Sequence, residues 1–186
     1  MISVDEAVAF EWVDYYFLFQ TMKVFLATLC LFLLASCEPG LTPPPEVEPG
    51  LGGTILFEKG TWPRQDSLFN LWVFASKIYP LDSSKIFTGL FSEPPAIYIH
   101  PSFEKNLPFF VDSTVYSFAL PAGTYKYIGV LQRFREEISV GSLRVVGLYG
   151  SNSIPPEPLQ VTVEDFQFVR GVNMKVNFHK PPRQPF

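Results

Sequence analysis

A short apolar run that ends at a cysteine divides this chain into a leader and a part that folds. The run covers residues 24–34, follows Lys23, and leads through two small residues to Cys37. A positive start, an apolar stretch of this length and small residues before a cut are typical of a secretory signal peptide. A membrane span takes about 20 apolar residues, so the run is too short for one. We therefore expect residues 22–36 to be a signal peptide.

The residues just before Cys37, which are Leu34, Ala35 and Ser36, resemble the lipobox of bacterial lipoproteins. The resemblance implies that Cys37 is lipidated and becomes the new N-terminus. It also implies a place in the cell envelope, anchored to a bacterial membrane, which is the outer membrane in a Gram-negative host. Two or more acyl chains anchor a protein stably, so we expect a peripheral protein without a transmembrane helix. The alternative interpretation is a buried apolar helix with a chance cysteine.

The flanking segments have different expected roles. Residues 1–21 contain four acidic residues ahead of the apolar run, which does not suit a signal peptide. An over-extended start explains them, with synthesis beginning at Met22; the alternative is a real extension that abolishes export. Residues 37–50 carry five prolines and form an extended, semi-rigid linker. We expect one domain over residues 51–180 and an irregular tail over 181–186.

Charge and cysteine content exclude several classes of function. From Glu38 onward there are 13 Lys and Arg against 14 Asp and Glu, a net charge of −1. Nucleic-acid binding needs a clustered basic face, so we expect no nucleic-acid partner. The two cysteines are Cys30, inside the leader, and Cys37. The mature chain therefore has no thiol for a disulfide or a thiolate metal site, and we expect neither a metal nor a cofactor.

Between the linker and the tail the hydrophobic pattern is that of β-strands. Apolar residues recur with a period of two over seven runs, and Gly and Pro residues mark the ends of these runs. The predicted strands are 53–57, 69–76, 115–120, 124–132, 143–149, 159–163 and 172–178, with a short extra strand at 97–99. Seven such runs predict an all-β domain, a single seven-stranded antiparallel β-sandwich.

Two of the runs, 69–76 and 124–132, are apolar on both faces, which indicates central strands. In the second of them Tyr125 and Tyr127 are expected to share a face. The proline-rich segment 78–112 is expected to be irregular.

A motif at residues 116–125 carries a family resemblance. Tyr116, Phe118 and Leu120 alternate before the turn at 121–123 and a second strand that begins with Thr124. This strand–turn–strand resembles that of the prealbumin-like modules, the carboxypeptidase regulatory-like and collagen-adhesin B-type domains. The likeness extends loosely over residues 51–179; the bulky second strand and the long connection after it depart from the family pattern. The resemblance implies a non-catalytic module used as a stalk, spacer or binding surface.

Aromatic side chains are the candidates for ligand contact. Trp62, Trp72 and Phe74 would form a patch if one sheet face were exposed, since large exposed apolar patches usually mark contact sites. The alternative is that the segment 78–112 folds over them. Two isolated histidines, His100 and His179, make a weak case for a metal.

One further motif matches a catalytic pattern. Ser102 and Lys105 have Ser-x-x-Lys spacing, but prolines bracket that loop and the companion motifs are missing. We therefore expect no enzyme.

Together these features predict a lipid-anchored envelope protein that acts as a non-catalytic binding or structural module. The alternative is a carbohydrate-binding lipoprotein of a surface glycan-uptake system. The expected partners are the membrane, through the lipid anchor, and an envelope protein or polysaccharide.

Overall fold

The computed structural model describes residues 22–23 and 47–186 of the chain. Contacts divide the chain into two units, and the second, Glu46–Phe186, contains the strands. Most of the leader, the lipobox residues, Cys37 and most of the linker lie outside the described residues. Among those described, no helix is long and apolar enough to cross a membrane.

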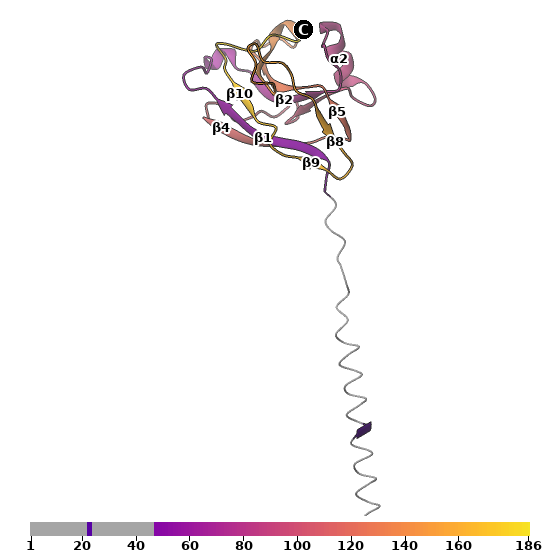
Figure 1. Ribbon diagram of the computed structural model, residues 1–186. Coiled ribbons are helices and arrows are strands. Elements are labelled where there is room, and N and C mark those ends of the chain that lie inside the picture. Colours follow the sequence, from indigo (N-terminus) through magenta and orange to yellow (C-terminus); the bar gives the residue numbers. More distant parts are fainter. Residues whose placement is uncertain (1–21, 24–46) are drawn as a thin grey trace, which may run out of the picture. The chain divides into compact units, whose positions relative to one another are not determined.

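Most of the second unit is one large sheet that curls on itself (Figure 1). Its path of strands runs β3 (Ile97–His100), β2 (Asn70–Ser76), β6 (Tyr127–Arg133), β7 (Leu143–Leu148), β10 (Met174–Val176), β1 (Gly50–Phe57) and β4 (Ser113–Ala119), with β9 (Phe168–Val169) pairing with β1 as the eighth strand. A second sheet pairs β5 (Gly123–Tyr125) with β8 (Val161–Val163). One α-helix, α2 (Ser83–Phe91), and two 3-10 turns, Gln65–Ser67 and Val140–Ser142, lie between strands.

The mostly-β class is confirmed, but the sheet is mixed. β1 pairs in parallel with β10, with Ile55 opposite Met174, and also in parallel with β9. The other pairs are antiparallel. The large sheet therefore has eight strands in mixed directions, whereas the sequence predicted seven antiparallel ones. Alternation along a strand reports which faces are buried, but it does not report the neighbour or its direction.

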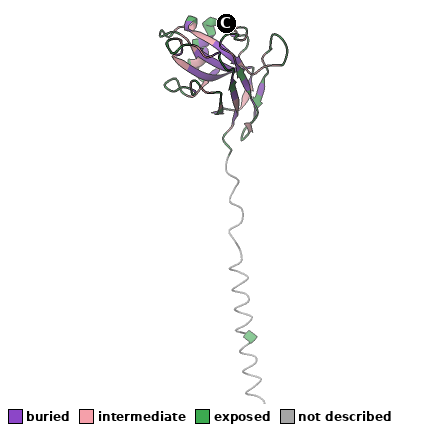
Figure 2. Cartoon of the chain, turned by 90° about the vertical axis from the view of Figure 1, so that its left-hand side faces the viewer, coloured by how far each residue is buried: buried purple, intermediate pink, exposed green. Residues whose placement is uncertain are grey.

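Two hydrophobic cores lie on opposite faces of the central strands. The first core takes Leu71, Val73 and Ala75 of β2 together with buried residues of β1, β4, β6, β7, β8 and β10. The second core takes Trp72 and Phe74 from the other face of β2. In Figure 2 buried residues follow the strands, whereas the loops are largely exposed. The prediction that residues 69–76 are apolar on both faces and central in the sheet is confirmed.

The run 124–132 is not one strand. The strand is interrupted at Lys126, whose backbone N–H donates to the Ser76 carbonyl at 2.8 Å. Residues before the break belong to β5 and those after it to β6. As a result Tyr125 packs in the first core and Tyr127 in the second, so the prediction of a shared face is wrong.

A helix forms within the segment that was expected to be irregular. The Asp82 side chain caps α2 and accepts from the Ser84 N–H at 3.1 Å, as N-cap residues do. That hydrogen bond holds the pKa of the Asp82 carboxyl below its usual value. The buried Ile86 turns toward the second core, where a cavity that it lines also touches Leu81. The helix thus helps to cover the face of the sheet that carries Trp72 and Phe74.

The first core depends on close packing, and Leu71 tests it. Leu71 is fully buried, whereas Val115 on β4 is 78% exposed. Leu71→Ala should lower the free energy of unfolding by about 2–5 kcal/mol, because it leaves a cavity. The control Val115→Ala should change it by less than about 0.5 kcal/mol. Urea unfolding measures both, and equal effects would contradict the described core.

Buried tyrosines should make the domain sensitive to alkali. Burial raises the pKa of Tyr116, Tyr125 and Tyr127 above the usual value for a phenol. Their stabilising effect is therefore complete below about pH 10, the unfolded pKa, and is lost as the pH rises above it. We expect the free energy of unfolding to fall by up to about 1.4 kcal/mol per pH unit for each tyrosine. Urea unfolding between pH 8 and 11 measures this, and Tyr116→Phe should make the slope shallower; an identical slope would refute the assignment.

Candidate functional site

Two of the three aromatic candidates are core residues. Trp72 is 4% exposed and Phe74 is 3% exposed. The indole N–H of Trp72 donates to the Lys105 carbonyl at 2.9 Å, so the segment 78–112 does fold over this face. Ligand contact by these two residues would require an exposed sheet face, and neither residue lies on one. Trp72 and Phe74 belong instead to the second core.

Trp62 lies elsewhere, against the first core. Its ring is half-buried and contacts Phe57 at 4.6 Å, Phe178 at 4.8 Å and Phe110 at 5.3 Å between centroids. The structure therefore does not bring Trp62 together with Trp72 and Phe74. Cys37 and the lipobox residues stay untested, since they lie outside the described residues.

The remaining residues with chemical potential are also separate. His100 packs on the Phe118 ring, and burial lowers its pKa, whereas His179 is exposed. Ser102 and Lys105 sit in an exposed turn, where the Lys105 N–H donates to the Ser102 carbonyl at 2.9 Å. Within residues 22–23 and 47–186 no three His, Cys, Asp or Glu residues form a group that could hold a metal.

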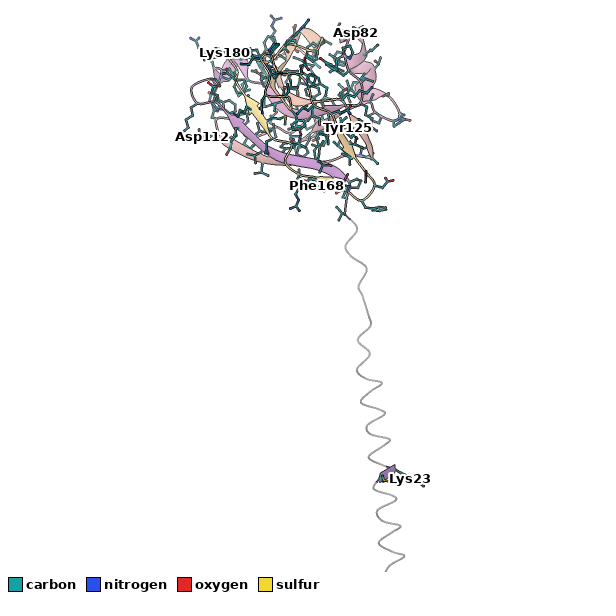
Figure 3. The ribbon with its side chains drawn as sticks, in the orientation of Figure 1. Lys23, Asp82, Asp112, Tyr125, Phe168 and Lys180 are labelled. Atoms are coloured by element: carbon teal, nitrogen blue, oxygen red, sulfur yellow. The ribbon has the colours of Figure 1, made fainter. Side chains whose placement is uncertain are left out.

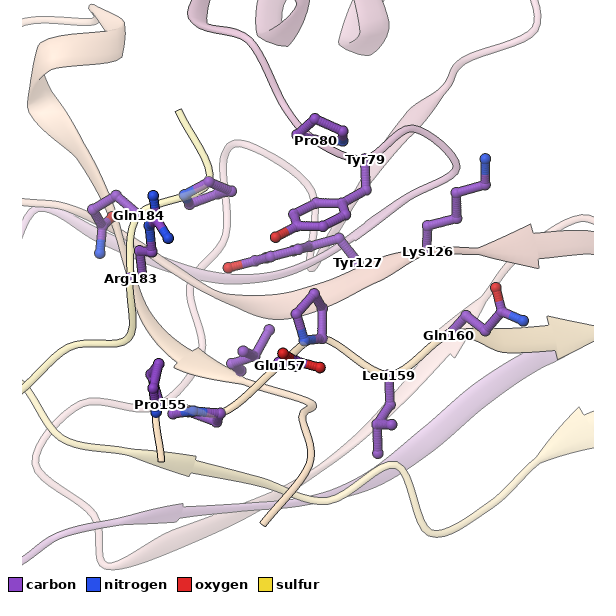
Figure 4. Close-up of a pocket in the computed structure, with 14 residues that line it drawn as sticks. Tyr79, Pro80, Lys126, Tyr127, Pro155, Glu157, Leu159, Gln160, Arg183 and Gln184 are labelled. Carbon is purple, nitrogen blue, oxygen red and sulfur yellow. The ribbon is translucent and has the colours of Figure 1, made fainter. Parts of the chain in front are cut away.

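The structure assembles a groove that the sequence did not indicate. This opening of about 790 Å³, which we call the tyrosine groove, is shown in Figure 4. Its walls come from Tyr79 and Pro80, from Lys126 and Tyr127, from Leu148 with residues 155–160, and from residues 183–185 of the tail. A volume of this size is typical of a ligand pocket.

Two stacked tyrosines form the wall of the groove. The Tyr79 and Tyr127 rings lie 5.2 Å apart at 25°, and Tyr127 also stacks on Phe74 at 5.5 Å. Figure 4 shows both rings projecting the same way, with their hydroxyls toward the side where Arg183 and Gln184 lie. Tyr79 is 43% exposed, so it presents ring surface to the groove.

The Tyr127 hydroxyl is buried without a hydrogen-bond partner. It is the one such side-chain atom in the part of the chain that the structure describes. The other two phenols with raised pKa values are paired: Tyr116 donates to the Val172 carbonyl and Tyr125 to the Pro121 carbonyl, each at 2.7 Å. Burial keeps the pKa of Tyr127 above its usual value, so its hydroxyl remains a hydrogen-bond donor. A lone buried hydroxyl costs stability, and native proteins keep few of them.

Charged side chains stand on the rim of the groove. Lys126, Glu157 and Arg183 are all exposed. Among the described residues these three side chains have no ion pair; the two pairs present are Lys59–Asp112 and Arg135–Glu137. The rim therefore offers two cations and one carboxylate to a bound molecule.

Local hydrogen bonds hold the walls in place. The Gln184 side chain binds the β7 backbone on both sides of Val145, accepting from its N–H at 2.8 Å and donating to its carbonyl at 3.0 Å. The loop that carries Glu157 is closed by the Ser151 N–H, which donates to the Glu157 carbonyl at 2.8 Å, and by the Glu157 N–H, which donates to the Ser151 hydroxyl at 3.0 Å. The tail and this loop are thus fixed to the sheet rather than loose.

Sequence reasoning missed these residues for separate reasons. Tyr127 has the pattern of a core residue and is one, since it is 2% exposed. Tyr79 falls in the connection that was expected to be irregular, and Gln184 in the tail. The clustered prolines at 155–158, next to Glu157, are the signal that could have drawn attention to a rigid exposed loop.

Comparison with known proteins adds no assignment. No protein-family model, no curated protein and no solved structure matches the chain.

Removing the Tyr127 hydroxyl should stabilise the free protein. Tyr127→Phe should raise the free energy of unfolding by about 1 kcal/mol, because it deletes a buried donor that lacks a partner. The matched control, Tyr116→Phe, should lower it by about 1 kcal/mol, since it leaves the Val172 carbonyl without that hydroxyl. Urea midpoints at an unchanged m-value measure both. A loss of stability in Tyr127→Phe as large as that of the control would show that the hydroxyl is paired.

Proposed function

We propose that this chain is a lipid-anchored bacterial envelope protein whose β domain is a non-catalytic binding module with its ligand in the tyrosine groove. The anchor is the lipid on Cys37, and the membrane is the outer membrane in a Gram-negative host. The observation that carries the binding role is the unpaired, buried Tyr127 hydroxyl in the wall of an open groove of about 790 Å³.

The character of the groove supports binding over catalysis. Its lining contains phenols, amides, prolines and three charged side chains, and it contains no Ser, Thr, Cys or His. The lining therefore lacks the serine, threonine or cysteine nucleophile and the histidine base of the common catalytic triads. The residues that match catalytic patterns, Ser102 and Lys105, lie in an exposed turn and are not among the lining residues.

A prealbumin-like sandwich is the fold that we propose for the module. In its favour, Tyr116, Phe118 and Leu120 are all buried in the first core ahead of the predicted turn. Tyr125, labelled in Figure 3, donates from its hydroxyl to the Pro121 carbonyl four residues upstream. A tyrosine bound back to the backbone in this way is a feature of Greek-key sandwiches.

A carbohydrate-binding lipoprotein of a surface glycan-uptake system is the second candidate function. The exposed Tyr79 ring favours it, because a sugar ring can pack its C–H face on an exposed aromatic side chain. In the leading proposal the partner is an envelope protein or a polysaccharide. Identifying the ligand that binds in the groove decides between these two partners.

The anchor is tested by labelling cells with radioactive palmitate. The wild-type chain should take up label and fractionate with membranes, whereas Cys37→Ser should lose both. Cys30→Ser is the matched control, because it also removes one thiol, and it should keep the label. A wild-type chain that stays unlabelled and unprocessed in the cytosol would refute the envelope assignment.

A further inference from the structure

We propose that the tyrosine groove binds an acidic oligosaccharide, with the sugar rings on Tyr79 and the proline walls and the anionic groups at Lys126 and Arg183. This inference rests on the proposed binding function and names the chemical class of its ligand.

Prolines reduce the number of main-chain donors that the groove offers to a peptide. Five of its lining residues are prolines, namely Pro80, Pro155, Pro156, Pro158 and Pro185. Proline has no N–H to donate, so these five positions cannot supply the main-chain donors on which strand addition by a peptide depends. Recognition at these positions depends on side chains. Besides the prolines and two leucines, the lining side chains are phenols, amides and charged groups.

That set of side chains suits a ligand rich in hydroxyl groups. Glu157 accepts hydrogen bonds, Lys126 and Arg183 donate them, and Gln160 does both. The flat ring of Tyr79 and the pyrrolidine rings supply apolar plates for the C–H faces of sugars. The volume of the groove, about 790 Å³, is large enough for a ligand bigger than a single small fragment.

The charges on the rim favour an acidic sugar. Lys126 and Arg183 have no anionic partner in the described part of the chain, and they outnumber the single carboxylate of Glu157. Figure 4 shows Lys126 and Arg183 on opposite sides of the tyrosine pair, so a ligand that crosses the pair meets a cation at each end. The planar guanidinium of Arg183 matches the two oxygens of a carboxylate.

The Tyr127 hydroxyl supplies a contact that only the bound state satisfies. Less than 1 Å² of its oxygen is accessible in the free protein. The neighbouring Tyr79 ring is 43% exposed, whereas Tyr127 is 2% exposed. When the ligand displaces the Tyr79 ring, a sugar oxygen accepts a hydrogen bond from the Tyr127 hydroxyl. The energetic cost of the unpaired hydroxyl then becomes part of the binding affinity.

Titration with paired oligosaccharides tests the proposal. The detergent-solubilised full chain is titrated with an oligogalacturonate and with its methyl ester, which has the same rings without the negative charges, while heat release is followed. We expect the acid to bind at least about 10-fold more tightly than the ester, and raising the salt from 0.05 to 0.5 M to weaken it. Equal binding of the two, or binding of neither, would overturn the acidic-sugar assignment.

Variants separate a ligand contact from a structural role. Tyr127→Phe and Arg183→Gln should each weaken binding about 5- to 10-fold. The controls Tyr98→Phe and Arg170→Gln change the same residue types outside the groove lining and should leave the affinity unchanged. A Tyr127→Phe protein that is more stable yet binds less tightly is the expected signature; unchanged affinity would contradict the proposal.

Two further outcomes keep this inference distinct from the proposed function. If a proline-rich peptide binds in the groove and the oligogalacturonate does not, the sugar assignment is wrong while the binding module stands. If the palmitate label is absent, the envelope assignment fails whatever the titration shows.

Discussion

The pairing of β2 with β6 is the interaction on which the rest of this domain depends. Seven residue pairs join the strands, from Asn70 opposite Arg133 to Ser76 opposite Tyr127, and both strands are buried on both faces. Their backbone groups therefore find partners within the sheet, as buried polar groups must. The buried Gln132 is satisfied as well, because it donates to the Ser67 carbonyl at 2.7 Å and accepts from Arg144 at 2.8 Å. This pair of strands separates the two cores and contributes buried side chains to both of them.

The break at Lys126 connects this pairing to the groove. Lys126 interrupts the chain's strand conformation between β5 and β6. Tyr125, before it, lies in the first core, and Tyr127, after it, lies in the second. Tyr125 finds the Pro121 carbonyl for its hydroxyl, but Tyr127 reaches a wall made of tyrosine, proline and tail residues that offers it no acceptor. The polar defect and the open groove thus arise from the same local change in strand direction. Native proteins keep few such unsatisfied groups, which is why this one marks the groove as a candidate site.

Parts of this architecture were predictable because they depend on neighbours along the chain. The predicted strand at 172–178 alternates, and this pattern predicts that Val172, Met174, Val176 and Phe178 face inward; all four are buried. The double-sided burial of 69–76 and the short strand at 97–99 were also correctly predicted. The helix α2 was missed, because nine residues give a weak periodic signal and its cap, Asp82, also suits a turn. The sequence left open whether the face with Trp72 and Phe74 is covered, because an alternating pattern cannot show whether a distant segment covers a face. The structure shows that it is covered.

The division between the two kinds of information has a physical basis. Periodicity, proline spacing, charge balance and the residues before Cys37 are local properties. The amino-acid order alone therefore predicts a mostly-β domain, which the structure confirms, together with a linker and an anchor. The parallel partner of β1, the burial of Trp72 and the groove itself depend on residues far apart in the chain, such as Tyr79, Glu157 and Gln184. Only folding brings those residues together. Each is held by its own contact: Tyr79 by a stack on Tyr127, Glu157 by hydrogen bonds to Ser151, and Gln184 by hydrogen bonds to Val145. The unpaired hydroxyl of Tyr127 belongs to this second group, because a missing partner is a property of surroundings and not of a residue type.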